Sequence, residues 1–426
     1  MIGLIMFVVA LALLLIGFPV AFTFAGVAVI FGVFSEGIDL FGFMPYRIMG
    51  VMQNTILIAI PLFIFMGIVL QKSKLAEQLL EAMGDLFGNI RGGLAVSTIL
   101  VGALLAASTG VVGASVVAMG VISLPVMLKH NYKKTLSTGV ICASGTLGQI
   151  IPPSIVLIIL ADVLGVPVGD LFNAAIIPSL VLVGSYIIYV LAIAYFDKDS
   201  APIIPRNTNN KSRYLSLAKA IIPPISLMIA VLGSIFSGIA TPTESASIGA
   251  IGSLILAFLY KRLNWKMLRE ASVETVKITS MIFAILIGAT AFSMVFTYSG
   301  GDILVEEFIL GLPAKEMSFI LISMAIILIL GFFIDFIEIS LIIVPILYPI
   351  AQTLGIDMAW FAILIAMNLQ ASFLTPPFGF SLFYLKGVAP KSVQTIDIYK
   401  GVVPFIIIQV LVLMSIVIMP ELYGFN

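Results

Sequence analysis

Two pairs of adjacent prolines are the residues of this sequence whose positions point most directly to chemistry. Pro152–Pro153 and Pro376–Pro377 each interrupt a run that is apolar enough to cross a bilayer. Proline lacks a backbone N–H and clashes with the preceding helical turn, so it leaves carbonyl oxygens without helical partners. In hydrocarbon such carbonyls are tolerated only where protein, water or a ligand satisfies them. Corresponding interrupted segments are typical of the ion and anion sites of secondary transporters.

Small and hydroxylated residues precede both breaks. Gly145, Thr146 and Gly148 come before the first pair, and Ser372 and Thr375 come before the second. Small side chains let backbone oxygens approach an ion closely, and hydroxyl groups add oxygen ligands. The alternative is a proline pair that only kinks a helix for packing, since prolines are common in membrane helices. Because the pattern occurs twice, we favour a binding site.

Two carboxylates interrupt another apolar segment. Asp335 and Glu338 are three residues apart and share one face of a helix. An uncompensated charge at membrane depth is costly, so such residues commonly serve ion coupling or gating. The alternatives are a charge at a water-lined edge, or a structural pair with a lysine such as Lys386.

Enzyme classes find little support. The sequence contains no Gly-Lys dipeptide and therefore no GxxxxGK phosphate-binding loop. His130 is the only histidine, so an HExxH metal site cannot form, and the residues around Ser115 do not match GxSxG. We expect no catalytic residues, no cofactor and no metal beyond a coupling ion, and energy must come from an ion gradient or a partner. A channel is a further alternative, but paired helix breaks fit alternating access better than a continuous pore.

Composition identifies the solvent of this chain as lipid. Hydrophobic residues make up 61% of the 426 positions and charged residues 10%, with a mean hydropathy of +1.22. Few polar side chains remain to coat a water-exposed surface. Apolar runs, of which Ile2–Val33 is the first, predict an all-α polytopic membrane protein with roughly a dozen spans of about 20 residues. The first run is too long for a signal peptide, and we expect it to be retained. The formal net charge of zero argues against nucleic acid as a partner.

An internal duplication follows from three ordered landmarks. Pro125 and Pro345 are 220 positions apart, each within an apolar hairpin. Pro152 and Pro376 are 224 apart, and Pro178 and Pro404, which open the next helices, are 226 apart. The polar segment 197–214 separates the two series, so the sequence predicts two repeats joined by a linker.

The expected organisation has four parts. They are N-terminal scaffold helices over 1–60; a first repeat over 61–196, with a hairpin at 108–130 and a broken helix at 134–160; a linker and central scaffold helices over 197–274; and a second repeat over 275–426, with a hairpin at 331–350, a broken helix at 357–385 and a C-terminal helix.

The segment TPTESAS contains a helix-start signature. Glu244 lies three residues after Thr241, with Pro242 between them, which predicts a capping box at the first turn of a helix. We favour this structural role. In the alternative interpretation Thr241 and Thr243 contact the transported anion.

A set of motifs, taken together, resembles one transporter family. The motifs are GFPVAF (17–22), STGVVGASVVAMGVISLPVML (108–128), GTLGQIIPPS (145–154), TPTESASIGAIG (241–252), GFFIDFIEISLIIVPILYPI (331–350) and NLQASFLTPPFGFSLF (368–383). In this order they are similar to the large membrane subunit of tripartite ATP-independent periplasmic (TRAP) transporters, over essentially the whole chain.

The resemblance implies a function and partners. It implies Na⁺-driven import of an organic acid anion by an elevator mechanism, with two inverted repeats, in a bacterial inner membrane. The implied partners are a small four-helix membrane subunit and a soluble periplasmic binding protein that delivers the carboxylate-containing substrate. The alternative is a stand-alone Na⁺-coupled dicarboxylate or anion carrier of related architecture.

The resemblance also implies positions for the sites. One sodium site would involve Ser108, Thr109, Gly148, Ile151 and Pro153; the other would involve Gly331, Ser372, Thr375 and Phe378, with backbone carbonyls as most of the ligands. The anion would lie between the breaks, near Gly113, Ala114, Ser115 and Asp335. This sequence departs from the family pattern at Ser372, where glycine is expected, and has Ala106 and Ala107 just before Ser108.

Overall fold

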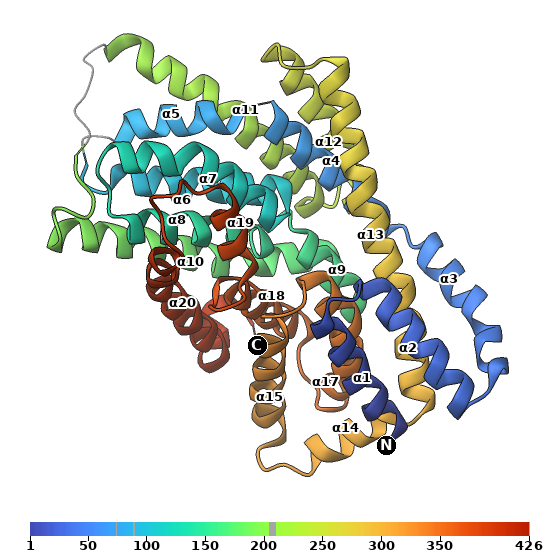
Figure 1. Cartoon of the computed structure of the whole chain (residues 1–426). Helices are drawn as coiled ribbons and strands as arrows, with labels where there is room; N and C mark the ends of the chain where they lie inside the picture. Colours follow the sequence, from blue (N-terminus) through green and yellow to red (C-terminus); the bar gives the residue numbers. More distant parts are fainter. Residues whose placement is uncertain (74, 88–89, 204–209, 426) are drawn as a thin grey trace.

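The computed structural model describes residues 1–73, 75–87, 90–203 and 210–425, and at positions 75–77, 81, 85, 108 and 210–217 it describes the backbone alone (Figure 1). Every regular element of the described residues is helical. The elements are α1 (Ile2–Ile16), α2 (Val20–Ser35), η1 (Ile38–Phe43), α3 (Met44–Gln53), η2 (Ile56–Ile58), α4 (Ala59–Lys72), α5 (Leu75–Phe87), α6 (Gly93–Thr109), α7 (Val112–Lys129), α8 (Lys134–Thr146), η3 (Leu147–Gln149), α9 (Ile155–Leu164), α10 (Val168–Phe196), α11 (Asn210–Phe236), α12 (Pro242–Leu259), α13 (Trp265–Tyr298), α14 (Gly301–Leu310), α15 (Lys315–Leu330), α16 (Phe336–Glu338), η4 (Ile339–Ile343), α17 (Val344–Thr353), α18 (Met358–Leu374), α19 (Phe380–Val388), α20 (Thr395–Ile418) and η5 (Pro420–Tyr423).

The all-helical membrane architecture is confirmed, but the number of full spans is lower than predicted. Seven described helices are long and apolar enough to cross a membrane, or eight if the bent pair Ile38–Gln53 and Ile56–Lys72 is one span. Five further apolar helices have 10–17 residues. The prediction of about a dozen spans was too high because apolar runs are divided by breaks. The run 2–33, for example, is divided between α1 and α2 at Gly17, which has a φ of 103°.

One group of helices forms what we call the scaffold group: α1–α5 and α11–α14. Within it α13 packs along α2 and α4, and α12 packs along α4 and α11 (Figure 1). Close approach depends on small residues, as expected where lipid supplies no hydrophobic drive between helices. A Cβ on Gly288 of α13, for instance, would lie 2.6 Å from the carbonyl oxygen of Ala21 in α2.

The remaining helices, α6–α10 and α15–α20, form what we call the hairpin group. The α8 helix packs against α6, α7 and α20, while α18 packs against α15 and α20 (Figure 1). The α8 and α20 backbones touch, because a Cβ on Gly139 would lie 2.1 Å from the carbonyl oxygen of Gly401. Since α8 precedes the linker and α20 follows it, this contact joins the two repeats.

Both hairpins begin earlier than the sequence predicted. The first consists of α6 and α7, so the predicted range 108–130 holds only its tip and second arm. The second has α15 as its first arm, so 331–350 likewise holds only the tip and second arm. Prolines mark the second arm in each case and no marker distinguishes the first, which explains the short predictions. The broken helices, by contrast, lie close to the predicted ranges, at 134–164 and 358–388.

Candidate functional site

The first helix break lies between α8 and α9. Here α8 ends at Thr146, the turn η3 follows to Gln149, and α9 begins at Ile155. The Ser154 hydroxyl caps α9 by accepting the Leu157 N–H at 3.4 Å, and it donates to the carbonyl oxygen of Gln149 at 2.7 Å. The break thus leads into a half-helix whose N-terminal end carries the positive end of a helix dipole.

The second break has a related construction, although α19 has no side-chain cap. The α18 helix ends at Leu374 and α19 begins at Phe380. The Ser381 hydroxyl donates to the carbonyl oxygen of Phe373 at 2.8 Å, and the Thr375 hydroxyl donates to that of Ala371 at 2.7 Å. Each break also contains one cis proline, at the second position of the Pro-Pro pair.

Carbonyl groups at corresponding positions accept hydrogen bonds from serine hydroxyl groups in both breaks. Gln149 and Phe373 are 224 positions apart, as are Pro152 and Pro376. Each of these two carbonyl oxygens accepts a hydrogen bond from a serine of the following half-helix. The duplication predicted from proline spacing therefore extends to the backbone hydrogen bonding of the breaks.

The two breaks also meet each other. Thr146 and Gln370 occupy corresponding positions, 224 apart, and both are fully buried. The Gln370 Nε2 donates to the Thr146 Oγ1 at 3.5 Å. This hydrogen bond therefore joins corresponding residues of the two breaks.

The end of α6 fits tightly against the first break. A Cβ on Gly148 would lie 2.3 Å from the carbonyl oxygen of Ala106. At the hairpin tip Gly110 has a φ of 62°, and a Cβ there would lie 2.8 Å from Ile155. Ala107 and Ile151 line one apolar cavity beside α11. The backbones of Gly148 and Ala106 therefore lie close together at this junction.

The second hairpin fits against the second break in a related way. A Cβ on Gly331 would lie 2.2 Å from the Ser372 Oγ. The Phe333 and Phe378 rings pack with their centroids 5.3 Å apart. These contacts bring the predicted second-site residues Gly331, Ser372 and Phe378 to one junction.

In the predicted first sodium site, the Thr109 hydroxyl group already forms hydrogen bonds within the chain. The Thr109 Oγ1 lies 2.8 Å from the Ser115 Oγ and 3.4 Å from the carbonyl oxygen of Ala106. The Ser108 side chain lies outside the described residues. Thr109 and Ser115 were assigned to sodium and substrate respectively, and the structure joins them across the first hairpin tip. Pro153 is buried in the adjoining break.

Predicted substrate residues on α7 lie where the two repeats and the scaffold group meet. Gly113 faces the Tyr384 ring of α19, since a Cβ on Gly113 would lie 2.9 Å from it. The carbonyl oxygen of Ala114 accepts the Gln71 Nε2 of α4 at 3.5 Å. The first hairpin tip therefore contacts the second repeat on one side and the scaffold group on another.

The two carboxylates lie at the start of the second arm of the second hairpin. Asp335 caps α16 by accepting the Phe336 N–H at 2.6 Å. Glu338 is 7% exposed, and its Oε2 has no hydrogen-bond partner among the described residues. The Lys386 ammonium donates instead to the carbonyl oxygen of Val393 at 2.8 Å. The suggested structural pair with Lys386 is therefore absent from the described ion pairs.

Thr241 and Thr243 belong to the scaffold group. The capping box predicted for Thr241 and Glu244 is confirmed, with the Thr241 N–H donating to the Glu244 Oε2 at 2.8 Å. The Thr243 Oγ1 donates to the carbonyl oxygen of Thr55 at 2.8 Å. Both hydroxyl groups thus hold α12 and the α3–α4 bend in place, which accounts for the motif without a substrate contact.

Two glutamines were not selected from the sequence but lie at the breaks. Gln149 is fully buried, and neither its Oε1 nor its Nε2 has a partner among the described residues. The Gln370 Oε1 is also without a described partner. A buried amide with free hydrogen-bonding capacity is costly unless something binds to it. Polar residues beside a break in an apolar run were the available signal.

Comparison with known proteins gives one family over nearly the whole chain. The family described as "Tripartite ATP-independent periplasmic transporter, DctM component" matches residues 7–422.

Individual relatives agree with that match. The chain is 32% identical to the C4-dicarboxylate TRAP transporter large permease protein DctM of Pseudomonas aeruginosa, over 79% of this chain and 78% of the relative. It is 27% identical to the sialic acid TRAP transporter large permease protein SiaM of Vibrio cholerae, over 96% and 95%. It is 30% identical to the isethionate TRAP transporter permease protein DctMQ of Oleidesulfovibrio alaskensis, over 86% of this chain and 57% of that protein.

A solved structure shares the fold. The Alcanivorax borkumensis YdaH transporter, described as having an unusual topology, superposes with a TM-score of 0.62 at 16% identity and covers 90% of each chain.

Proposed function

This chain belongs to the DctM family of TRAP transporter large permeases, and from that premise we propose that it imports an organic acid anion coupled to Na⁺. Family membership makes it a multi-pass membrane protein of secondary transport. The coupling ion, the site and the transport movement are the parts that we propose here.

The observation that carries the proposal is the repeated junction of hairpin and break. In each repeat a hairpin arm touches a Pro-Pro break with no room for an added Cβ, at Gly148 in the first and Gly331 in the second. Sodium prefers oxygen ligands, and unwound backbone at membrane depth supplies carbonyl oxygens where side chains are small. We assign one Na⁺ to each junction.

The anion is assigned to the space between the two junctions. The half-helices α9 and α19 both begin at the breaks, and helix N-termini favour negative charge. Gly113, Ala114 and Ser115 border this region on the first hairpin, and the Gln149 and Gln370 amides supply free donors and acceptors. The relatives named for C4-dicarboxylates, sialic acid and isethionate share an acidic group as the common chemistry.

An elevator movement of the hairpin group against the scaffold group is the proposed cycle. Hydrogen bonds between the groups include Gln71 to Ala114 at 3.5 Å and Asn54 to Asp162 at 2.5 Å. Contacts within the hairpin group include close backbone approaches, as at Gly139 and Gly401, and these would persist while the hydrogen bonds between groups exchange. Na⁺ and anion should raise each other's affinity equally, because binding linkage is reciprocal.

Partners follow from the family. TRAP large permeases work with a small membrane subunit and a periplasmic binding protein, and we propose both for this chain, in the bacterial inner membrane. The binding protein would deliver the anion and make much of the selection between acids.

The test is uptake into proteoliposomes under an imposed inward Na⁺ gradient, with C4-dicarboxylate, sialic acid and isethionate as radiolabelled probes. We expect uptake of one acid that requires the gradient, the small subunit and the binding protein. Uptake that is unchanged when K⁺ replaces Na⁺ would refute the coupling ion. Na⁺-driven uptake by the chain alone would make it a self-sufficient carrier.

A further inference from the structure

The first turns of α13 extend beyond the apolar part of the helix. The helix has 34 residues, and all its charged residues lie between Lys266 and Lys277. The remaining stretch, 278–298, contains no charged residue and spans about 31 Å at 1.5 Å per residue. That length matches a hydrocarbon core of about 30 Å. The charged turns of α13 therefore lie at the level of the lipid headgroups and beyond.

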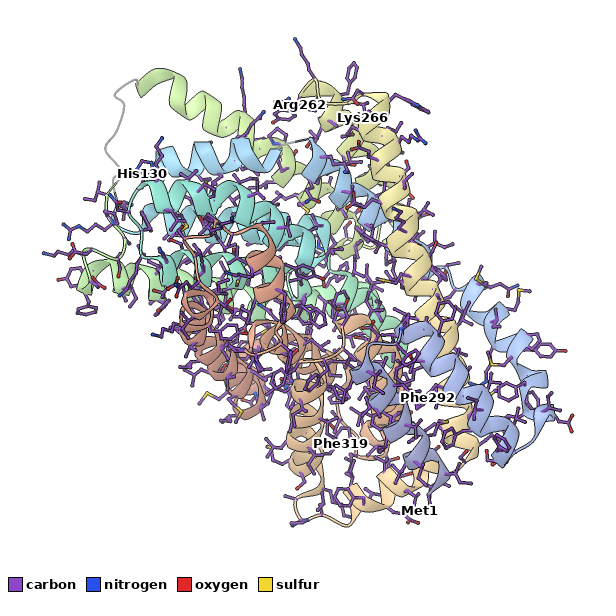
Figure 2. All side chains as sticks on the ribbon, in the orientation of Figure 1. Met1, His130, Arg262, Lys266, Phe292 and Phe319 are labelled. Carbon is purple, nitrogen blue, oxygen red and sulfur yellow. The ribbon has the colours of Figure 1, made fainter. Side chains whose placement is uncertain are left out.

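Cations gather at this end of the molecule. The segment KRLNWKMLR, 261–269, contains four basic residues and no acidic one. Arg262 and Lys266 lie at the end of the molecule opposite Met1 and Phe319 (Figure 2). Basic segments of membrane proteins are enriched on the cytoplasmic side, where anionic lipids give the surface its negative potential.

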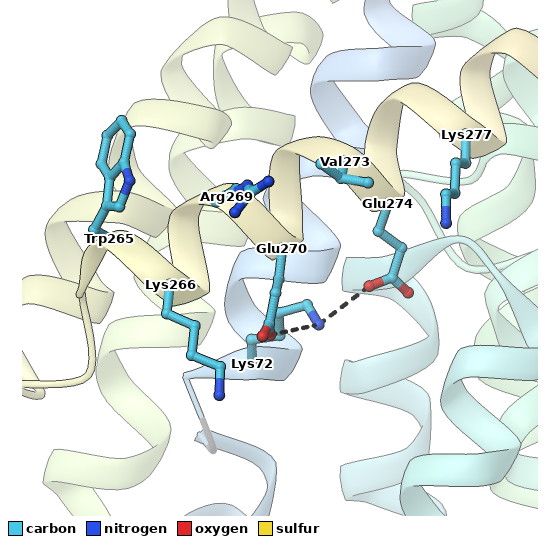
Figure 3. A pocket seen from close by; sticks show the side chains of 8 residues that line it. All are labelled: Lys72, Trp265, Lys266, Arg269, Glu270, Val273, Glu274 and Lys277. Atoms are coloured by element: carbon cyan, nitrogen blue, oxygen red, sulfur yellow. Dashed lines mark ion pairs between the residues drawn. The ribbon is translucent and has the colours of Figure 1, made fainter.

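A single lysine forms ion pairs with both acidic residues of the same turns. The Lys72 Nζ, at the end of α4, lies 3.6 Å from the Glu270 Oε2 and 3.2 Å from the Glu274 Oε2 (Figure 3). Among the described residues no ion pair involves the other cations of this end of α13, which are Lys266, Arg269 and Lys277. All three are exposed.

These residues line one cavity with a volume of about 660 Å³. Its remaining lining comes from Trp265, which is 79% exposed, and from Val273 (Figure 3). Trp265, Arg269, Val273 and Lys277 succeed one another at intervals of four residues and so form one stripe along the helix. Tryptophan favours the membrane–water interface, and arginine binds phosphate through paired N–H groups.

We propose that this cavity binds the phosphate headgroup of an anionic phospholipid, with Arg269, Lys266 and Lys277 contacting the phosphate and Trp265 and Val273 contacting the adjoining glycerol and acyl region. A lipid fits better than free phosphate because the cations share the cavity with exposed apolar side chains at the membrane boundary. This site is separate from the proposed transport site and does not depend on it.

The test measures the thermal unfolding midpoint of the full chain in detergent, titrated with phosphatidylglycerol, phosphatidylcholine or inorganic phosphate. We expect only phosphatidylglycerol to raise the midpoint. The variant Lys266→Gln/Arg269→Gln/Lys277→Gln should need more than about tenfold more of this lipid for half the effect, since each basic residue near a membrane surface contributes about 1 kcal/mol. The control Lys315→Gln/Lys391→Gln/Lys400→Gln removes three exposed charges elsewhere and should titrate like the unaltered chain.

Four results would overturn the assignment. They are a midpoint that phosphatidylglycerol does not change, an equal response to phosphatidylcholine, a response to inorganic phosphate of the same size, and a triple variant that titrates like the control. If the triple variant does not fold, Arg269→Gln alone should raise the half-effective lipid concentration about fivefold, and an unchanged titration would refute the site.

Discussion

Gly331 and Ser372 touch where the second hairpin meets the second break, and a Cβ on Gly331 would lie 2.2 Å from the Ser372 Oγ. In the first repeat a close contact between hairpin and break involves a different position of the hairpin. There the break carries Gly148 and the hairpin carries Ala106, and a Cβ on Gly148 would lie 2.3 Å from the Ala106 carbonyl oxygen. The close approach at Gly331 thus depends on a glycine of the hairpin, and the close approach at Gly148 depends on a glycine of the break.

The contact between Gly331 and Ser372 predicts a compensating pair of substitutions. Gly331→Ala should separate hairpin from break, because overpacking of a filled site costs about 1–3 kcal/mol. The concentration of Na⁺ for half-maximal uptake should rise roughly tenfold. Adding Ser372→Gly removes the Oγ and Cβ that the new methyl group meets.

We therefore expect Gly331→Ala/Ser372→Gly to recover most of the Na⁺ dependence in the same proteoliposome assay. A double variant as impaired as Gly331→Ala would contradict the role assigned to the contact between Gly331 and Ser372. Gly233→Ala serves as the matched control, since a Cβ at Gly233 meets nothing within 4 Å.

The first junction gives a prediction that has no such rescue. Gly148→Ala places its Cβ against the backbone of Ala106, which cannot be shortened by substitution. We expect loss of Na⁺-stimulated uptake at physiological Na⁺ concentration, while the amount of protein inserted in the membrane stays unchanged. Gly184→Ala, in α10, is the control because a Cβ there meets nothing within 4 Å. Unaltered Na⁺ dependence in Gly148→Ala would remove the first sodium assignment.

The sequence predicted the breaks and the duplication well because proline has a strong local effect on the helix. Gln149 and Phe373 have the same spacing in the sequence as Pro152 and Pro376. The carbonyl oxygen of each accepts a hydrogen bond from a serine hydroxyl group. The capping box of Thr241 was also predictable, since both of its partners lie within one helical turn.

Contacts between distant segments were not predictable in the same way. Ser372 departs from the glycine expected at the break, and the compensating Gly331 is 41 positions away. Only the packing of α15 and its tip against α18 brings these two residues together. The first hairpin arms were missed for a similar reason, because α6 and α15 become arms only through what they pack against.

Substitution of the buried amide of Gln149 distinguishes a role in stability from a role in function. Both of its polar atoms are buried without a partner among the described residues, so Gln149→Leu removes a desolvation cost of about 1–3 kcal/mol. The thermal unfolding midpoint without substrate should stay the same or rise. Uptake should fall at least tenfold if the amide contacts the anion or an ion ligand.

The contrasting result for Gln149→Leu is a lower midpoint with normal uptake at equal protein, which would make the amide structural. Gln409→Leu provides a comparison, since Gln409 in α20 is likewise fully buried but lies away from both breaks in sequence.

Asp335 and Glu338 provide a test of charge in the second hairpin. Asp335→Asn keeps an oxygen that can accept the Phe336 N–H, so the cap of α16 and the fold should survive. We expect at least a tenfold reduction in uptake with the unfolding midpoint nearly unchanged. Glu307→Gln, at an exposed position of α14, removes the same charge as a control. Uptake equal to that of the unaltered chain would reduce Asp335 to a structural cap.

Substitutions of Thr241 and Thr243 distinguish a structural role of the TPTES segment in the scaffold group from a role in substrate binding. Thr241→Ala removes a helix cap and should lower the free energy of unfolding by about 1 kcal/mol. Thr243→Val removes the hydrogen bond to the Thr55 carbonyl oxygen, with a loss of similar size. Because both hydroxyl groups already have partners in the scaffold group, the substrate concentration for half-maximal uptake should change less than twofold. A several-fold increase without loss of stability, measured on the same protein preparations by uptake and thermal unfolding, would instead place these threonines against the anion.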